Sequence, residues 1–155
     1  MKLDRYERMF LIVAVAVLLG FQAAIGISVA LTRVRLPAPV ERVDARTLRQ
    51  TPPFNQPGLR QTGPNTYEAV IIAQAWQFNP NEITVPVGST VTFLVSSPDV
   101  THGFELTGTD VNAMVVPGEV TKVTAHFTKP GDYVFLCNEY CGFGHQTMYG
   151  KVVVR

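Results

Sequence analysis

Cysteine is scarce in this sequence of 155 residues: there are two, Cys137 and Cys141, and neither belongs to a Cys-x-x-Cys-His motif. The absence of that motif excludes covalent attachment of a c-type heme. Internal repeats and low-complexity segments are also absent, which excludes solenoid and array architectures. A chain of this length suffices for one domain with a core, plus an appendage.

Net positive charge is absent from the C-terminal part of the chain. Residues 62–155 carry four Lys or Arg against eight Asp or Glu, a net charge of −4 (4 − 8), whereas residues 1–61 carry nine against four. This acidity argues against nucleic acid as a partner of the C-terminal part. It suits a basic partner protein that approaches by electrostatic steering, although acidic surfaces also occur on domains with no such role.

Charged residues are missing between Met9 and Leu31, and Gln22 is the only strongly polar side chain in this run of 23 residues. A helix of that length spans about 35 Å, enough to cross a hydrocarbon core of about 30 Å. A cleavable signal sequence ending at Ser28-Val29-Ala30 is the alternative. Because signal cores are usually about 7–15 residues long, we favour a retained transmembrane helix over residues 9–31.

The orientation of this helix is ambiguous from charge alone. The basic residues before it are Lys2, Arg5 and Arg8, and those after it are Arg33, Arg35, Arg42, Arg46 and Arg49. Counting positive residues places the C-terminal side in the cytoplasm. We predict the opposite, because a folded domain after a first helix is often translocated: residues 1–8 in the cytoplasm, and the domain on the outer or periplasmic side of the cell membrane.

Proline is concentrated between residues 32 and 61, where five occur: Pro37, Pro39, Pro52, Pro53 and Pro57. Because proline blocks helix continuation and sheet pairing, this segment is predicted to be a semi-rigid connector. A short helical turn between Val40 and Leu48 is the only regular structure that we consider there.

Short runs rich in β-branched and aromatic residues fill positions 62–155, separated by Pro, Gly and Asn turn signals. The predicted strands are Tyr67–Ala73, Glu82–Val87, Thr90–Ser96, Val111–Val116, Val120–Phe127, Asp132–Cys137 and Tyr149–Val154. This pattern predicts an all-β domain over residues 62–155, either a β-sandwich or a Greek-key barrel.

Soft and borderline metal ligands cluster between Cys137 and Met148, a segment that also contains His145. Thiolate, imidazole and thioether favour copper over calcium or magnesium. Two cysteines separated by three residues suggest two sulfurs shared between two metals. Three alternatives remain. A disulfide would leave His145 and Met148 unexplained, zinc would have an unusual ligand in Met148, and a mononuclear blue-copper site would leave one cysteine idle.

A second imidazole must come from His102 or His126, the other two histidines. His126 lies within an alternating strand pattern and is interpreted as an ordinary strand residue. His102 is predicted to lie in a turn between two strands, Ser97–Phe104. Loops held by a rigid barrel often carry metal ligands, so His102 is the better candidate.

Taken together, Ser-x-Asp-Val-x-His at 97–102 and Cys-x-Glu-x-Cys-Gly-x-Gly-His-x-x-Met at 137–148 resemble the CuA domain of cytochrome c oxidase subunit II. The resemblance extends from about Tyr67 to Arg155. The single helix is most similar to the compact subunit II of B-type heme-copper oxidases. The resemblance implies a cupredoxin-like Greek-key β-barrel or sandwich with one N-terminal transmembrane helix.

The resemblance also implies a ligand set for two coppers. Cys137 and Cys141 would bridge both metals, His102 and Met148 would complete one, and His145 with the backbone carbonyl of Glu139 would complete the other. The Glu139 side chain matches a carboxylate that binds Mg²⁺ at the boundary with subunit I in many members, and such a hard ligand suits that ion.

Four further residues match family positions with weaker implications, and each has an ordinary alternative. Trp76 and Phe78 resemble an aromatic run near the point where electrons enter, but that run often begins with an aromatic residue where this chain has Gln74; Trp76 is equally well a core residue. Asp99 matches an acidic docking position, or simply starts a turn. Glu7 matches a residue that helps protons enter subunit I, or is a charge flanking a span.

The implied function is that of subunit II of a heme-copper terminal oxidase. It would accept electrons from cytochrome c or a similar small redox protein and pass them to heme in subunit I. Subunit I would reduce O₂ to water, coupled to proton translocation, and a small extra helix subunit is a further expected partner. A stand-alone electron carrier, the copper domain of another reductase and a copper-delivery protein remain alternatives.

Overall fold

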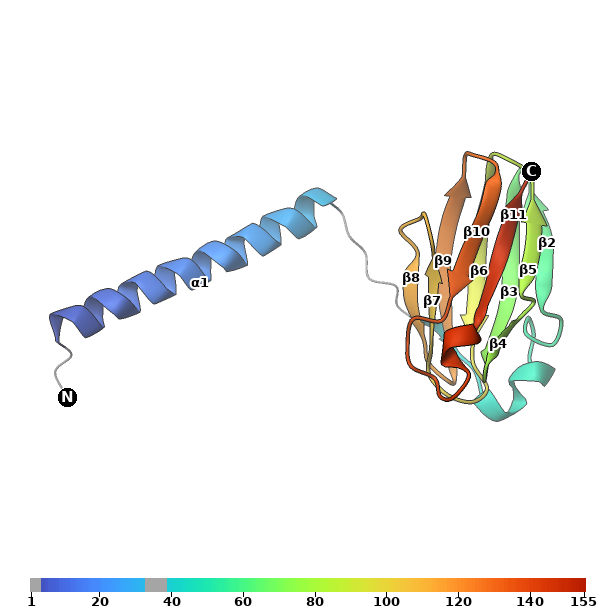
Figure 1. The fold of residues 1–155 in the computed structure, drawn as a ribbon, viewed down its shortest axis with the longest axis horizontal. Coiled ribbons are helices and arrows are strands. Elements are labelled where there is room, and N and C mark those ends of the chain that lie inside the picture. Colours follow the sequence, from blue (N-terminus) through green and yellow to red (C-terminus); the bar gives the residue numbers. More distant parts are fainter. Residues whose placement is uncertain (1–3, 33–38) are drawn as a thin grey trace. The chain divides into compact units, whose positions relative to one another are not determined.

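The computed structural model describes residues 4–32 and 39–155, which fall into two units, one within Met1–Leu36 and the other within Pro37–Arg155. Lys2, Arg33, Arg35 and Pro37, which entered the charge and proline counts, lie outside the described residues. The two units are drawn in Figure 1 and are described separately.

The first unit is one helix, α1 (Arg5–Thr32), of 28 residues and about 42 Å at 1.5 Å per residue. Its described side chains are all exposed, and its composition permits a membrane span over Arg5–Leu31. A capping box starts the helix. Asp4 Oδ1 accepts a hydrogen bond from the Glu7 N–H (2.9 Å), and Glu7 Oε2 accepts one from the Asp4 N–H (3.1 Å).

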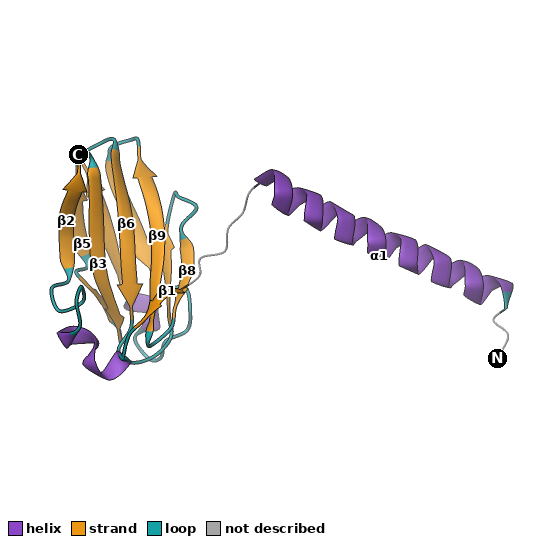
Figure 2. Ribbon diagram, turned by 180° about the vertical axis from the view of Figure 1, so that it is seen from behind, coloured by secondary structure: helices purple, strands orange, loops and turns teal. Residues whose placement is uncertain are grey.

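The second unit is a sandwich of two β-sheets (Figures 1 and 2), as predicted. Its elements are β1 (Pro39–Arg42), η1 (Ala45–Gln50), β2 (Gly58–Gly63), β3 (Thr66–Gln74), β4 (Gln77–Asn79), β5 (Glu82–Val85), β6 (Ser89–Ser96), β7 (His102–Leu106), β8 (Asn112–Val115), β9 (Glu119–Phe127), β10 (Gly131–Leu136), η2 (His145–Thr147) and β11 (Tyr149–Val154). One sheet has the order β1-β9-β6-β3-β2, with β4 paired to β3, and the other has the order β5-β11-β10-β7-β8.

Alternation of apolar and polar residues explains which face of each strand packs inward. On β9, Val123, Ala125 and Phe127 are buried, whereas Lys122, Thr124 and His126 are exposed. His126 Nδ1 lies 2.9 Å from Thr90 Oγ1 on the neighbouring strand β6. The interpretation of His126 as an ordinary strand histidine is therefore confirmed.

Aromatic rings fill the space between the sheets. Phe104 of β7 packs against Phe78, Phe93 and Phe135, with ring centroids 5.9, 5.3 and 5.3 Å away. All four rings are buried. Because Phe104 is two residues from His102 on the same strand, this core also fixes the backbone that carries the histidine.

The prediction that His102 lies in a turn is wrong. His102 is the first residue of β7 and pairs with Val115 of β8, and its side chain is 0% exposed. The irregular segment that was predicted over Ser97–Phe104 ends at Thr101, three residues earlier than predicted. The run of β7 is interrupted by Gly103 and Glu105, so its strand pattern was too weak to recognise from sequence.

The proline-rich segment also differs from the predicted connector, because most of it folds onto the sandwich. We call residues 39–57 the collar. Its β1 pairs with β9, its 3-10 helix η1 replaces the helical turn considered at Val40–Leu48, and its Leu48 and Phe54 are 0% exposed. These two side chains pack with Val70, Ile72 and Val120. Proline is compatible with such packing at a sheet edge.

Candidate metal centre

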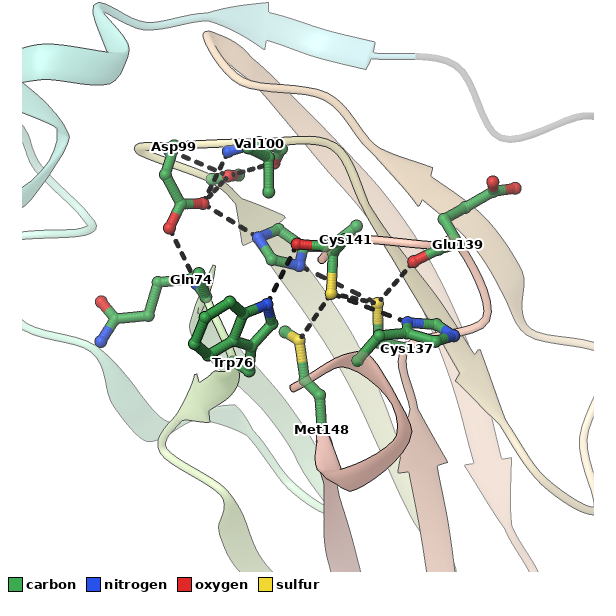
Figure 3. A network of polar contacts seen from close by, with 12 residues as sticks. Gln74, Trp76, Asp99, Val100, Cys137, Glu139, Cys141 and Met148 are labelled. Atoms are coloured by element: carbon green, nitrogen blue, oxygen red, sulfur yellow. Dashed lines mark hydrogen bonds and ion pairs between the residues drawn. The ribbon is translucent and has the colours of Figure 1, made fainter. Parts of the chain in front are cut away.

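The soft ligands meet where three strand ends come together. His102 begins β7, Cys137 directly follows β10, and Met148 directly precedes β11. We call residues 137–148 the ligand loop; its base is closed by a hydrogen bond from the Cys137 N–H to the Met148 carbonyl (3.1 Å). Figure 3 shows the sulfur atoms of Cys137, Cys141 and Met148 directed toward one another.

The two cysteines are not joined in a disulfide. Their Sγ atoms are 3.6 Å apart, compared with about 2.05 Å in a disulfide. A metal–thiolate bond is about 2.3 Å long, taking the value for zinc. One ion can therefore contact both sulfurs, because twice that bond length exceeds their separation. The arrangement fits shared thiolates.

Each sulfur has further ligand atoms beside it. Cys137 Sγ lies 3.9 Å from His102 Nδ1 and 3.1 Å from the Glu139 carbonyl oxygen. Cys141 Sγ lies 3.7 Å from His145 Nδ1 and 3.7 Å from Met148 Sδ. The structure thus brings together all six ligand groups that the family resemblance implies.

The centre is mostly closed to water. Cys137, Cys141 and Met148 are buried, and His145 is half-buried in η2. Burial, and to a smaller extent the adjacent Cys137 thiol, raise the pKa of the Cys141 thiol to about 12. Within residues 4–32 and 39–155, His102, Cys137 and Cys141 form the one group of three or more His, Cys, Asp or Glu ligand atoms lying within 4.8 Å of each other.

Glycine allows β7 to approach the ligand loop. The Gly103 N–H donates to Cys137 Sγ at 3.4 Å, and a Cβ at this position would lie 2.7 and 2.8 Å from the backbone nitrogens of Asn138 and Glu139. No side chain fits there. Sequence reasoning missed Gly103, although its position directly after a candidate ligand was a usable signal.

Asp99 lies beside the site rather than on an open surface. Its side chain is 34% exposed, and Oδ1 is 2.9 Å from His102 Nε2. Partial burial raises the pKa of the Asp99 carboxyl, but hydrogen bonds from the Ala75 N–H, from His102, from the Val100 N–H and from Ser97 outweigh this effect. The pKa therefore lies below its ordinary value.

The two aromatic residues of the β3–β4 region, Trp76 and Phe78, differ in their exposure to solvent. Trp76 is 41% exposed and its Nε1–H donates to the Cys141 carbonyl at 3.1 Å. Phe78 is 3% exposed and packs in the core. Phe78 is therefore not available as a surface contact, contrary to the implied role, because β4 directs it between the sheets.

The side chains of the two glutamates with implied roles make different contacts. Glu139 directs its carbonyl oxygen toward Cys137 while its side chain points away (Figure 3) and is exposed. Glu7 belongs to the capping box of α1, which is a structural reason for a glutamate at that position.

Three exposed aromatic side chains lie on the ligand loop or directly after it, and sequence reasoning did not single them out. Phe143, Tyr140 and Tyr149 are 85%, 81% and 65% exposed. Phe143 makes an edge-on contact with Trp76 (centroids 6.3 Å apart), and Tyr140 makes one with His145 (5.7 Å). We call Trp76, Tyr140, Phe143 and Tyr149 the aromatic rim. Of these four, only Trp76 was considered from the sequence. Tyr140 and Phe143 lie between ligands in the sequence and Tyr149 directly follows one, which was the available signal for the other three.

Comparison with known families decides which metal protein this is. Residues 72–155 match the family described as cytochrome c oxidase subunit II, periplasmic domain. The chain belongs to this family. A cytochrome c oxidase subunit 2 of Thermus thermophilus is 44% identical over 154 residues, covering 97% of this chain and 92% of the relative.

Solved structures agree with membership in the subunit II family. A chain of a heme-copper terminal oxidase dimer, determined by electron cryo-microscopy, has a TM-score of 0.74 and 36% identity, covering 97% of this chain and 100% of that chain. The periplasmic domain of cytochrome oxidase subunit II from Bradyrhizobium japonicum has a TM-score of 0.53 and 22% identity, covering 57% of this chain and 83% of that one. At that identity it supports the cupredoxin-like fold alone.

These findings identify the complex to which the chain belongs and the type of its folded domain. It is subunit II of a heme-copper oxidase, a subunit of cytochrome c oxidase, with a cupredoxin-like copper-binding domain. The candidate ligands include His102, Cys137 and Cys141. Other oxidase subunits are implied as partners, and the family together with helix α1 indicates a membrane protein.

Proposed function

We propose that the ligand loop and His102 hold a dinuclear CuA centre. Cys137 and Cys141 would be shared by both coppers, His102 and Met148 would hold one, and His145 with the Glu139 carbonyl would hold the other. One observation carries this assignment. Each sulfur lies beside one ligand of each set: Cys137 beside His102 and the Glu139 carbonyl, and Cys141 beside Met148 and His145.

The copper pair would supply one-electron chemistry in which the charge is spread over two metals. The chain contributes a rigid and dry environment for it. Burial of Cys137, Cys141 and Met148 excludes water, and the weak thioether and carbonyl ligands set the reduction potential. The Gly103 N–H directed at Cys137 Sγ stabilises thiolate charge.

The electron donor docks, in this proposal, on the aromatic rim. Exposed apolar side chains gathered around a functional group are typical of interaction sites, and Trp76 connects the rim to the ligand loop through Cys141. The donor is cytochrome c or a similar small redox protein. Electrons then pass to heme in subunit I, where O₂ is reduced to water with proton translocation.

The membrane arrangement and the remaining sites belong to the same proposal. Helix α1 crosses the cell membrane with its N-terminus in the cytoplasm, and the copper domain lies on the outer side, despite the arginines that follow the span. The exposed Glu139 carboxylate is available for Mg²⁺ at the subunit I boundary. Glu7 assists proton uptake, and a small helix subunit completes the complex.

Metal content and redox stoichiometry test the copper assignment. The full chain in detergent is loaded with copper and titrated with reductant. We expect two coppers per chain and uptake of one electron per pair. One copper per chain, zinc alone, or two electrons per pair would each contradict the proposal.

A further inference from the structure

Both oxygens of the Asp99 carboxylate accept hydrogen bonds from groups around the metal site. Oδ1 lies 2.9 Å from His102 Nε2 and accepts from the Val100 N–H at 2.7 Å and from Ser97 Oγ at 3.0 Å. Oδ2 accepts from the Ala75 N–H at 2.8 Å. Figure 3 shows the Asp99 carboxylate with one oxygen toward the His102 ring and the other toward the backbone that follows Gln74. The acceptors are directed at the protein rather than at a docking partner.

The residue after Ala75 continues the connection to the ligand loop. Trp76 Nε1–H donates to the Cys141 carbonyl at 3.1 Å. Its indole also lies close against the loop: a Cβ at Gly144 would be 2.8 Å from Trp76 Cγ and Cδ2. The turn between β3 and β4 is thus bound on one side to Asp99 and on the other to Cys141.

We propose that Asp99 is a positioning residue for the metal centre. One carboxylate oxygen holds His102 as the tautomer protonated on Nε2, which leaves Nδ1 available to metal beside Cys137. The other oxygen holds the turn whose indole fixes the ligand loop at Cys141. The same carboxylate therefore sets the distance between the two segments that carry the ligands. This inference rests on the proposed copper centre.

The physical reason lies in what each group does without the carboxylate. The His102 ring is 0% exposed, so water cannot readily replace the partner of Nε2, and the opposite tautomer would place a proton on the nitrogen that must bind metal. The Ala75 N–H loses its acceptor as well. A charged acceptor for both groups is a stronger constraint than a neutral one.

Asp99→Asn tests the proposal, with Asp110→Asn as the matched control. Asp110 is exposed, has no side-chain hydrogen bond or ion pair among the described residues, and lies in the turn after β7, at the far end of that strand from His102. Nitrogen NMR of the metal-free full chain in detergent gives the first measurement. We expect the Nε2-protonated tautomer of His102 in the parent chain and a mixture of tautomers in Asp99→Asn alone.

Copper loading gives the second measurement. In Asp99→Asn we expect copper to be lost to a chelator about 10–100-fold more readily, the hyperfine coupling of the His102 nitrogen to change, and the reduction potential to rise as negative charge is removed. Asp110→Asn should match the parent chain. Identical tautomer and coupling in the two variants would overturn the proposal. The tautomer is measured without metal. A failure of the proposal about Asp99 is therefore distinguishable from a failure of the chain to bind two coppers.

Discussion

The two imidazoles of the centre are held in different ways. His102 is fully buried at the start of a strand, with Asp99 on one ring nitrogen and the Phe104 core two residues away. His145 is half-buried in the ligand loop, and its ring contacts are Cys141 and the exposed Tyr140. The fold holds one side of the site, and a loop that also faces outward holds the other.

The different support of His102 and His145 predicts different effects of substitutions on the two sides of the site. Changes on the His102 side should alter stability and metal geometry together, because that side is part of the core. Changes on the loop side should alter metal binding or partner contact while the sandwich stays folded. The following substitutions test that division, beginning with the largest expected effect.

Cys141→Ser should abolish the centre, because this sulfur lies beside a ligand of each proposed copper. We expect loss of the paired-copper spectrum while the domain remains folded. Copper content and circular dichroism measure the two properties. A variant that retained two coppers and an unchanged spectrum would refute the shared-thiolate assignment.

Phe104→Ala should destabilise the His102 side. Deleting a fully buried phenylalanine costs about 3–5 kcal/mol, and Phe104 is in contact with three other rings. Denaturant unfolding of the metal-free chain gives the free energy. The contrasting variant is Phe143→Ala, at a ring 85% exposed, which should change stability by less than about 0.5 kcal/mol. Equal losses would contradict the division.

Gly103→Ala should separate β7 from the ligand loop. Its Cβ would lie 2.7 Å from the Asn138 nitrogen, a backbone atom that cannot rotate away, and overpacking of this kind costs about 1–3 kcal/mol. We expect lower stability and a changed copper spectrum. The control is Gly63→Ala, whose Cβ would have its nearest neighbour at 3.8 Å. If both variants behaved alike, the close approach would be unimportant.

Copper affinity should rise with pH. The raised pKa of Cys141, about 12, keeps this thiol protonated near neutrality, and a metal ligand must be deprotonated. Binding therefore releases a proton, and affinity should increase about tenfold per pH unit for each proton released. Chelator competition at several pH values measures this slope. A flat profile would contradict the prediction, because it would show that the Cys141 thiol is already ionised without metal.

Phe143→Ala should slow electron transfer from the donor and leave copper binding intact. Truncation of a residue that anchors an interface costs more than about 1 kcal/mol of binding, so we expect roughly a fivefold to tenfold effect. Stopped-flow reduction by cytochrome c measures it. Val87→Ala is the control, since Val87 is 41% exposed and precedes β6 at the end remote from the ligand loop.

The sequence predicted the sandwich, most of its strands and the ligand types, because alternation on β9 and the soft-ligand spacing of the loop are local signals. It did not predict that His102 starts a strand, since Gly103 weakens the strand pattern while serving close packing. The collar was mistaken for a connector because its burial depends on two residues, Leu48 and Phe54, that meet Val70 and Ile72 only in the folded chain. Local pattern cannot reveal such long-range contacts.

The pairing of the coppers through both sulfurs is the central claim, and electron paramagnetic resonance of the copper-loaded full chain tests it most directly. One unpaired electron shared equally by two coppers gives a seven-line hyperfine pattern, which is the result that the arrangement around Cys137 and Cys141 predicts. A four-line pattern would confine the electron to one copper and would contradict the account.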